Sequence, residues 1–181
     1  YLSAEDDALT IHRRVHHALE QLPEDLREQA AANFYGIPVH GGVNLCRAIG
    51  GTVESTANYE DLRNILDAIR PRLLVLDTLA RFSGVDENDN PAMTAFCGLL
   101  EGLIDAYGCN IILLHHSNKT SGDLIEDPKE LAKALTQTAM RGASALAGCI
   151  RWGMLVAPLG AALAQKRIGE PATGKYDGAF L

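Results

Sequence analysis

The sequence predicts an α/β fold, in which a mainly parallel β-sheet carries helices on both faces. Two short apolar runs, residues 72–77 and 110–116, lack polar alternation, as strands do when both faces of a parallel sheet are buried. A helical pattern precedes each run. Helices and strands that alternate at this spacing are typical of βαβ units. We expect residues 1–181 to form a single domain with a sizeable core.

The first elements predicted are two helices. Ser3, followed by Asp6 three residues later, has the pattern of a capping box. Apolar residues then repeat on roughly one helical face to about Leu22. Pro23 predicts the start of a second helix, in which Leu26 should face inward.

The middle of the chain predicts a short strand, a glycine-rich segment and a third helix. Residues 36–39 have the pattern of a short strand, and residues 40–56 that of a loop with a weak hairpin. Asn58 is the expected cap of the next helix, and Pro71 ends it.

The two apolar runs are separated by a further helix, which should begin near Pro91 and end at Gly108. A long polar stretch follows at residues 117–138, with a helical pattern at 128–135. Polar stretches of this length are usually functional or disordered. Residues 150–156 predict another strand.

Composition excludes several classes of protein. The net charge of −7 means that any contact with nucleic acid must be local. The longest apolar run, residues 153–164, contains Pro158 and is too short to span a bilayer, so no membrane partner is expected. The four cysteines are widely spaced, and three lie among apolar neighbours, as in a reduced, cytoplasmic protein.

Asp77 is the first candidate for a functional site. It ends the first apolar run, where a bare carboxylate costs several kcal/mol unless a partner needs the charge. Ligands of parallel sheets bind beyond the carboxyl ends of the strands, where Asp77 and the pair His115 and His116 both stand. In phosphate-loop NTPases a carboxylate in this place holds magnesium. The alternative is an aspartate that only caps the following loop, and the pattern alone leaves both open.

The histidines favour no metal site. Neighbouring residues on a strand point to opposite faces, so one ion can hardly bind both His115 and His116. His12 and His16 have the spacing of a metalloprotease helix, but the residues between them lack the general-base glutamate. We interpret this pair as part of a solvated helix face.

Two further patterns have competing interpretations. Residues 169–176, "GEPATGKY", fit the spacing of a phosphate loop until the last position, where Tyr176 replaces the Ser or Thr that reaches magnesium. The residues before this segment have a helical pattern and predict no strand, so we interpret the segment as a surface turn. Glu5 either favours the positive end of a helix dipole or, as a carboxylate at a strand end, activates a water. The pattern does not decide between these roles.

Three segments occur together in the order of a known family: "YLSAED" at Tyr1, "RLLVLDTLARF" at Arg72, and "NIILLHHSNK" with "MRGASALAGCIRW" after it. They resemble the RecA-like ATPase domain of the hexameric plasmid-replication helicase RepA and its AAA-type relatives, from Tyr1 to about Trp152. The resemblance implies a RecA-like P-loop NTPase core that binds ATP and Mg²⁺. It also implies a homo-oligomeric ring, a hexamer.

The resemblance implies roles for four residues. Glu5 would be the general base for the attacking water, and Asp77, in the segment like Walker B, would be the carboxylate of the Mg²⁺ site. The segment "LHH" resembles the sensor strand, which implies His116 as the residue that detects the γ-phosphate. The segment "RGAS" implies Arg141 as an arginine finger that reaches the nucleotide of a neighbouring subunit.

In that family the phosphate loop precedes the segment that begins at Tyr1, and a final strand would follow Leu181. We therefore expect a piece of a longer protein, truncated at its N-terminus and also at its C-terminus, which does not hydrolyse ATP by itself. The stretch at residues 117–140 is the candidate contact for single-stranded DNA, although it is longer and more acidic than such a loop needs to be.

The leading function is thus ATP hydrolysis by the motor domain of a replicative DNA helicase-like protein. One alternative is a RecA-like regulatory or assembly ATPase that does not unwind DNA, and another is a non-enzymatic remnant of the fold. An intact Gly-x-x-x-x-Gly-Lys-Ser/Thr sequence upstream favours an enzyme, and its decay favours the remnant.

Overall fold

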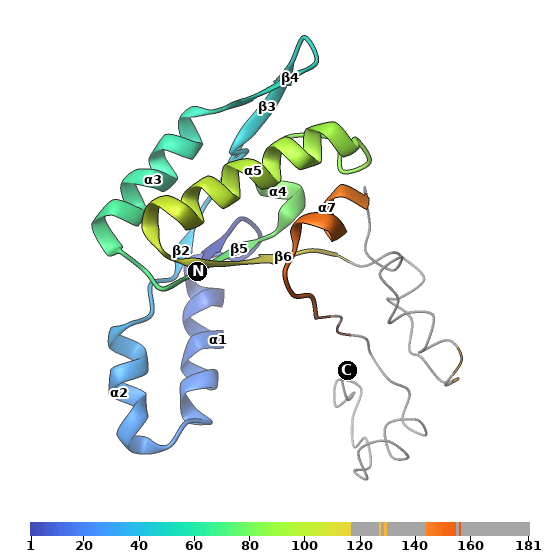
Figure 1. Cartoon of the computed structure of the whole chain (residues 1–181). Coiled ribbons are helices and arrows are strands. Elements are labelled where there is room, and N and C mark those ends of the chain that lie inside the picture. The colour runs from blue at the N-terminus through green and yellow to red at the C-terminus, as the bar shows by residue number, and fades with distance from the viewer. Residues whose placement is uncertain (117–126, 128, 130–143, 155, 157–181) are drawn as a thin grey trace. The chain divides into compact units, whose positions relative to one another are not determined.

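The computed structural model describes residues 1–116, 127, 129, 144–154 and 156 (Figure 1). The chain divides into two compact units, residues 1–115 and 116–181. The strands of the first unit are β1 (Leu2–Ser3), β2 (Ile37–Pro38), β3 (Cys46–Ile49), β4 (Thr52–Ser55), β5 (Leu73–Asp77) and β6 (Asn110–Leu114). Its helices are α1 (Ala8–Glu20), α2 (Glu24–Ala32), α3 (Ala57–Ile69), α4 (Leu79–Phe82) and α5 (Asn90–Tyr107).

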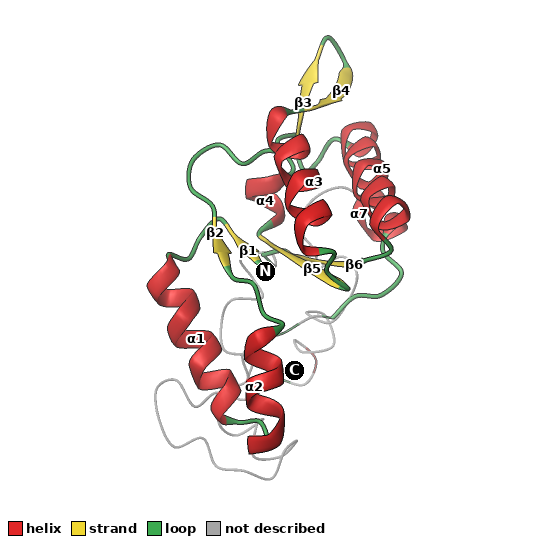
Figure 2. Cartoon of the chain, turned by 90° about the vertical axis from the view of Figure 1, so that its left-hand side faces the viewer, coloured by secondary structure: helices red, strands yellow, loops and turns green. Residues whose placement is uncertain are grey.

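The first unit is built around a four-stranded sheet with the order β2-β1-β5-β6, in which every neighbouring pair is parallel. Helices α3 and α5 lie on one side of this sheet and α1 and α2 on the other (Figures 1 and 2). This arrangement confirms the predicted α/β fold with a mainly parallel sheet and helices on both faces. It is consistent with a RecA-like core.

The hydrophobic core lies between the sheet and the helices α3, α4 and α5. Helix α5 has an apolar stripe at helical spacing, and removing it from water is the main source of its stability. The largest fully buried side chains include Phe82, Phe96, Leu45, Leu66, Leu76, Leu79, Met93 and Leu103.

Strands β5 and β6 are less buried than the sequence predicts. In β5, Leu74 and Leu76 are buried, but Val75 is half-buried and Leu73 is exposed. Strand β6 contains no buried residue: Ile112 is 37% exposed and Leu114 is 40% exposed. The prediction that β6 is buried was wrong because, in the described part of the chain, β6 pairs with β5 alone.

The first helix begins later than the capping-box pattern predicts. Ser3 belongs to β1 and is paired with Asp77 of β5, so its backbone is extended. Its hydroxyl still accepts the amide of Asp6 at 3.0 Å, but without starting a helix. The N-cap of α1 is Asp7, whose carboxylate accepts from the amide of Thr10 at 2.7 Å.

Other helix ends were predicted more closely. Pro23 caps α2 and Gly108 ends α5, as expected. Leu26, however, is exposed, and the cap of α3 is Thr56 instead of Asn58. The Asn58 amide group donates instead to backbone carbonyls of the preceding loop.

The predicted hairpin is present, and its root is fixed to the segment after β5. Strands β3 and β4 are antiparallel and project from the first unit (Figure 1). The amide of Leu45 donates to the carbonyl of Phe82, and the Cys46 thiol donates to the carbonyl of Ser83, both at 2.7 Å. Gly84 follows with a φ of +70°, and a Cβ on it would lie 2.0 Å from the carbonyl oxygen of Cys46. Only glycine fits this junction.

In the second unit the described part consists of α7 (Ser144–Cys149) and the irregular residues after it. The strand predicted at 150–156 is wrong, since residues 150–154 and 156 are not in a strand. Trp152 and Met154 are exposed there, and an apolar run forms a strand only when a neighbour completes its hydrogen bonds. The predicted helix at 128–135, apart from residue 129, and the segment 169–176 lie outside the described residues.

Among the described helices, none has both the length and the hydropathy needed to cross a bilayer.

Candidate functional site

The candidate site lies where β1 and β5 end side by side. These strands are parallel, with Leu2 opposite Leu76 and Ser3 opposite Asp77. The amide of Ala4 then donates to the backbone carbonyl of Asp77 at 2.7 Å. Residues directly after β1 are therefore held beside the carboxyl end of β5, where parallel sheets bind ligands.

Asp77 is a buried carboxylate with two hydroxyl donors. The residue is only 8% exposed. The phenol of Tyr1 donates to Oδ2 at 2.5 Å and the hydroxyl of Ser3 donates to the same oxygen at 3.3 Å. Within the described residues Asp77 forms no ion pair, and its described side-chain partners are two hydroxyl groups.

Glu5 lies beside Asp77 through Thr78. The Thr78 hydroxyl donates to Oε1 of Glu5 at 3.1 Å, and Thr78 is itself buried directly after Asp77. Glu5 is exposed, in contrast to Asp77. The two carboxylates thus share one end of the sheet, one enclosed and one open to water.

A third acid, Asp6, has a different partner. Its carboxylate forms an ion pair with Arg14 of α1 and lies 3.5 Å from the phenol oxygen of Tyr1. A phenol has one proton to donate, and the distance of 2.5 Å to Asp77 identifies Asp77 as its acceptor. Asp6 is therefore paired with Arg14, and the phenol of Tyr1 donates its hydrogen bond to Asp77.

The phenol of Tyr1 is a donor at any ordinary pH. Burial raises its pKa to about 12, and the hydrogen bond to Asp77 adds to the rise. Ionisation of Tyr1 would place two negative groups in contact. The pair therefore consists of a neutral donor and a carboxylate.

The residues at this end of the sheet are compatible with a magnesium ion that takes most of its ligands from water and phosphate. No group of three or more His, Cys, Asp or Glu residues that could hold a metal exists in the described part of the chain. Magnesium, however, is commonly bound through one or two carboxylates, with waters and substrate phosphates as the other ligands. Both hydroxyl donors described for Asp77 reach Oδ2, and neither of them occupies Oδ1.

The described contacts do not test the other two predicted site residues. His116 begins the second unit and is exposed. Arg141 lies outside the described residues. The structure therefore brings Glu5 and Asp77 together, and the roles of all four residues stay predictions.

Sequence reasoning missed three side chains of the site: Tyr1, Ser3 and Thr78. A signal was present, because residues two apart on a strand point to the same face, and Tyr1 and Ser3 have this spacing. It became meaningful only with the register that places Ser3 opposite Asp77. The capping-box pattern instead predicted that the hydroxyl of Ser3 binds the backbone at a helix start.

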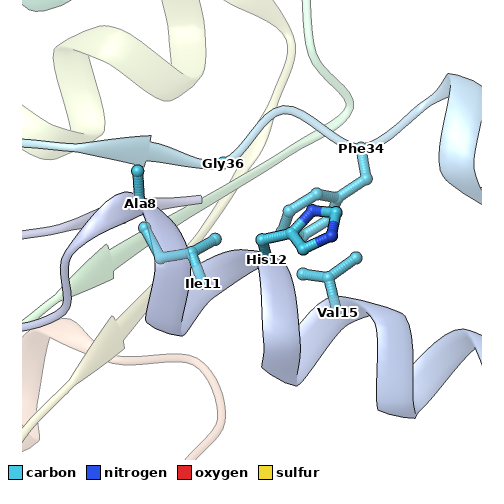
Figure 3. Close-up of a pocket in the computed structure, with 6 residues that line it drawn as sticks. All are labelled: Ala8, Ile11, His12, Val15, Phe34 and Gly36. Carbon is cyan, nitrogen blue, oxygen red and sulfur yellow. The ribbon is translucent and has the colours of Figure 1, made fainter.

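A separate hollow of about 250 Å³ lies between α1 and the segment before β2 (Figure 3). Neither Glu5 nor Asp77 lines it. The residues around it are Ala8, Ile11, His12, Val15, Phe34 and Gly36.

The pair His12 and His16 lies on an exposed face of α1, as predicted. Their rings are stacked with centroids 6.3 Å apart, and Nε2 of His16 lies 3.5 Å from a carboxylate oxygen of Glu20. This is the solvated helix face that the sequence predicted.

Comparison with known proteins agrees with this architecture. A profile of the AAA domain family matches residues 1–122, which include β1, β5, β6 and the candidate site. No solved structure matches the chain. Because the family match covers more than half of the 181 residues, the chain belongs to the AAA domain family.

Proposed function

We propose that this chain is part of the ATP-hydrolysing motor domain of a replicative DNA helicase-like protein that works as a hexameric ring. Membership of the AAA domain family indicates an ATPase-type domain. The observation that carries the proposal is the placement of Glu5 and Asp77 at one end of the sheet, linked through Thr78. One carboxylate for magnesium and one for water are what phosphoryl transfer to water requires.

In this proposal the two carboxylates have different tasks because their surroundings differ. Asp77, enclosed and hydrogen-bonded, holds the Mg²⁺ that accompanies ATP. When bound, this ion supplies positive charge to the phosphates. Glu5 is exposed and its Oε1 is oriented by Thr78, so it accepts the proton of the attacking water.

His116 and Arg141 complete the proposed machinery. His116 follows the end of β6 by two residues, close in the chain to the edge where nucleotides bind in such sheets. Arg141 is proposed to reach the nucleotide of the next subunit, where a planar guanidinium contacts a phosphate in a bidentate manner. Both roles rest on the resemblance to hexameric helicases.

The first test measures ATP turnover by a full-length protein that carries a phosphate loop. Glu5→Gln should slow hydrolysis by about 10²–10⁴-fold and leave nucleotide binding intact, because only the general base is lost. Asp77→Asn should also lower turnover strongly, because the magnesium site loses its charge.

Matched controls for these variants lie on the exposed surface of α5. Glu101→Gln and Asp105→Asn make the same chemical changes away from the site and should leave turnover unchanged. Normal turnover by Glu5→Gln would reduce Glu5 to a residue near a helix start and remove the observation on which the proposal depends.

The second test separates a helicase from an ATPase with another output. The full-length protein should form rings and displace one strand of a forked DNA in an ATP-dependent manner. Because the chain carries a net charge of −7, the DNA contact must be confined to a local surface, for which we propose residues 117–140. ATP hydrolysis without strand displacement or DNA binding would favour the regulatory or assembly ATPase.

The third test concerns Arg141 in trans. Arg141→Ala subunits are mixed with subunits that carry a Lys→Ala change in the phosphate loop. Mixed interfaces can then pair an intact nucleotide site with an intact arginine, so the mixture should hydrolyse ATP when neither variant does alone; such a finger is worth about 10³–10⁵ in turnover. Full activity of Arg141→Ala alone would remove this role.

A further inference from the structure

Tyr1 makes the shortest hydrogen bond to the candidate magnesium carboxylate. Its phenol donates to Oδ2 of Asp77 at 2.5 Å, compared with 3.3 Å from the hydroxyl of Ser3. The contact joins residues 76 positions apart in the sequence, so it depends on the pairing of β1 with β5. No motif in the sequence assigns a function to this tyrosine.

The geometry of the strands makes the contact a fixed one. Tyr1 and Ser3 stand two residues apart on an extended segment, which directs both side chains to the same face. Ser3 lies opposite Asp77 in the register, so both hydroxyl groups reach the same carboxylate oxygen. A carboxylate held at one oxygen loses the freedom to rotate and presents its other oxygen in one orientation.

We propose that Tyr1 is a positioning residue that holds Oδ2 of Asp77 and thereby presents Oδ1 to the hydrated magnesium of the nucleotide. The inference deepens the proposed function and rests on it. Groups that hydrogen-bond to metal-binding carboxylates fix the orientation of those ligands, and their loss typically costs about 10–100-fold in metal affinity or activity.

The competing explanation is that Tyr1 only contributes packing. Its ring lies near Phe34, with ring centroids 6.3 Å apart. Tyr1→Phe keeps this ring and deletes the hydroxyl alone, so a packing role predicts no change in magnesium binding. Tyr59→Phe is a matched control, because the Tyr59 phenol is also part-buried and donates to the backbone carbonyl of Leu99 at 3.1 Å, on the helices α3 and α5.

The experiment uses the full-length protein with Glu5→Gln as background, so that ATP binds without being consumed. The Mg²⁺ concentration that gives half-maximal binding of a fluorescent ATP analogue is measured for Tyr1→Phe and Tyr59→Phe. Tyr1→Phe should raise this concentration about 10-fold or more, and Tyr59→Phe should leave it unchanged. An unchanged Mg²⁺ requirement in Tyr1→Phe would overturn the proposal.

A second measurement needs neither metal nor nucleotide. The phenol proton of Tyr1, in a short hydrogen bond to a carboxylate, should give a downfield NMR resonance that exchanges slowly with water. The resonance should be absent in Tyr1→Phe and shifted in Asp77→Asn. An unshifted resonance in Asp77→Asn would show that the phenol does not donate to this carboxylate. Where Tyr1→Phe fails to fold, the response to Asp77→Asn still tests the hydrogen bond on which the proposal depends.

The outcomes separate the two proposals. Failure of the wild-type protein to bind ATP with Mg²⁺ would overturn the proposed function and this inference with it. Normal Mg²⁺-dependent binding by the wild type, together with an unaffected Tyr1→Phe variant, would overturn only the role of Tyr1.

Discussion

Strands β5 and β6 pair along their whole length, from Leu73 with Asn110 to Asp77 with Leu114, yet their surroundings differ. β5 has strand neighbours on both sides and buries Leu74, Leu76 and Asp77. In the described part of the chain β6 has a neighbour on one side, and none of its residues is buried. Two apolar strands of equal length therefore differ in burial because of what lies beside them. The buried carboxylate of Asp77 accordingly lies on β5, the strand with neighbours on both sides.

The largest effect that tests this contrast concerns the glycines next to the two strands. Gly84, shortly after β5, and Gly108, shortly before β6, both have a positive φ, of +70° and +63°. A Cβ on Gly84 would lie 2.0 Å from the carbonyl oxygen of Cys46, whereas a Cβ on Gly108 meets nothing within 4 Å. Gly84→Ala should therefore cost more than about 4 kcal/mol of stability, and Gly108→Ala about 1–2 kcal/mol from backbone strain alone.

Urea unfolding of both alanine variants measures this difference. Comparable losses of unfolding free energy in the two variants would mean that the backbone at Gly84, after β5, is no more crowded than the backbone at Gly108, before β6.

The next prediction compares leucines of the two strands. Leu76 is fully buried in β5 and Leu114 is 40% exposed in β6. Leu76→Ala should lower the free energy of unfolding by about 2–5 kcal/mol, because it leaves a cavity in a packed core. Leu114→Ala should lower it by about 1 kcal/mol, since its site is open to water. Chemical denaturation with a common slope checks both values, and equal losses would contradict the difference in burial.

Hydrogen exchange should show the same contrast without mutation. The hydrogen-bonded amides of β5 should exchange only through global unfolding, because strands cover both of its sides. Those of β6 should exchange through local opening, about tenfold faster or more. Amide exchange of β5 and β6, followed by NMR, tests this. Equal protection of the two strands would mean that β6 is shielded from water to the same extent as β5.

The smallest effect is a pH dependence at Cys46 of β3, whose thiol donates to the carbonyl of Ser83 after β5. Burial raises the pKa of the Cys46 thiol from its ordinary value of 9.0 to about 11. The stability that this neutral thiol contributes is complete below pH 9 and is lost as the pH rises toward 11, because the unfolded thiol ionises first. Urea unfolding between pH 8 and pH 11 should therefore show a steeper loss in the wild type than in Cys46→Ala. Cys149→Ala, at a partly exposed thiol, serves as the control.

The contrast between β5 and β6 also defines what could be predicted of the fold. The runs that became β5 and β6, the helices before them and the glycine that ends α5 were predictable from local pattern. The burial of β6 was not, because the same apolar run suits a central strand and an edge strand. The start of α1 was also predicted wrongly, because strand pairing overrides a local pattern. Ser3 is a residue type that often caps helices, but its pairing with β5 makes its backbone extended.

The candidate site was predictable to a similar extent. Acids at strand ends stand out in a sequence, so Glu5 and Asp77 were found. Their hydroxyl partners were not, since Tyr1, Ser3 and Thr78 reach these acids across 73 to 76 positions of sequence. Such contacts follow from strand register, which is a property of the folded chain.

The junction at Gly84 has a practical consequence for protein engineering. The hairpin formed by β3 and β4 is fastened at its root by Leu45 and Cys46, whereas at its tip Gly50 and Gly51 have open space around them. Exposed tips of this kind accept inserted peptides, and each doubling of loop length costs only about 0.6 kcal/mol. A fluorophore-binding tag placed between these two glycines should therefore label the protein without displacing Asp77, because the hydrogen bonds of Leu45 and Cys46 hold the base of the hairpin in place.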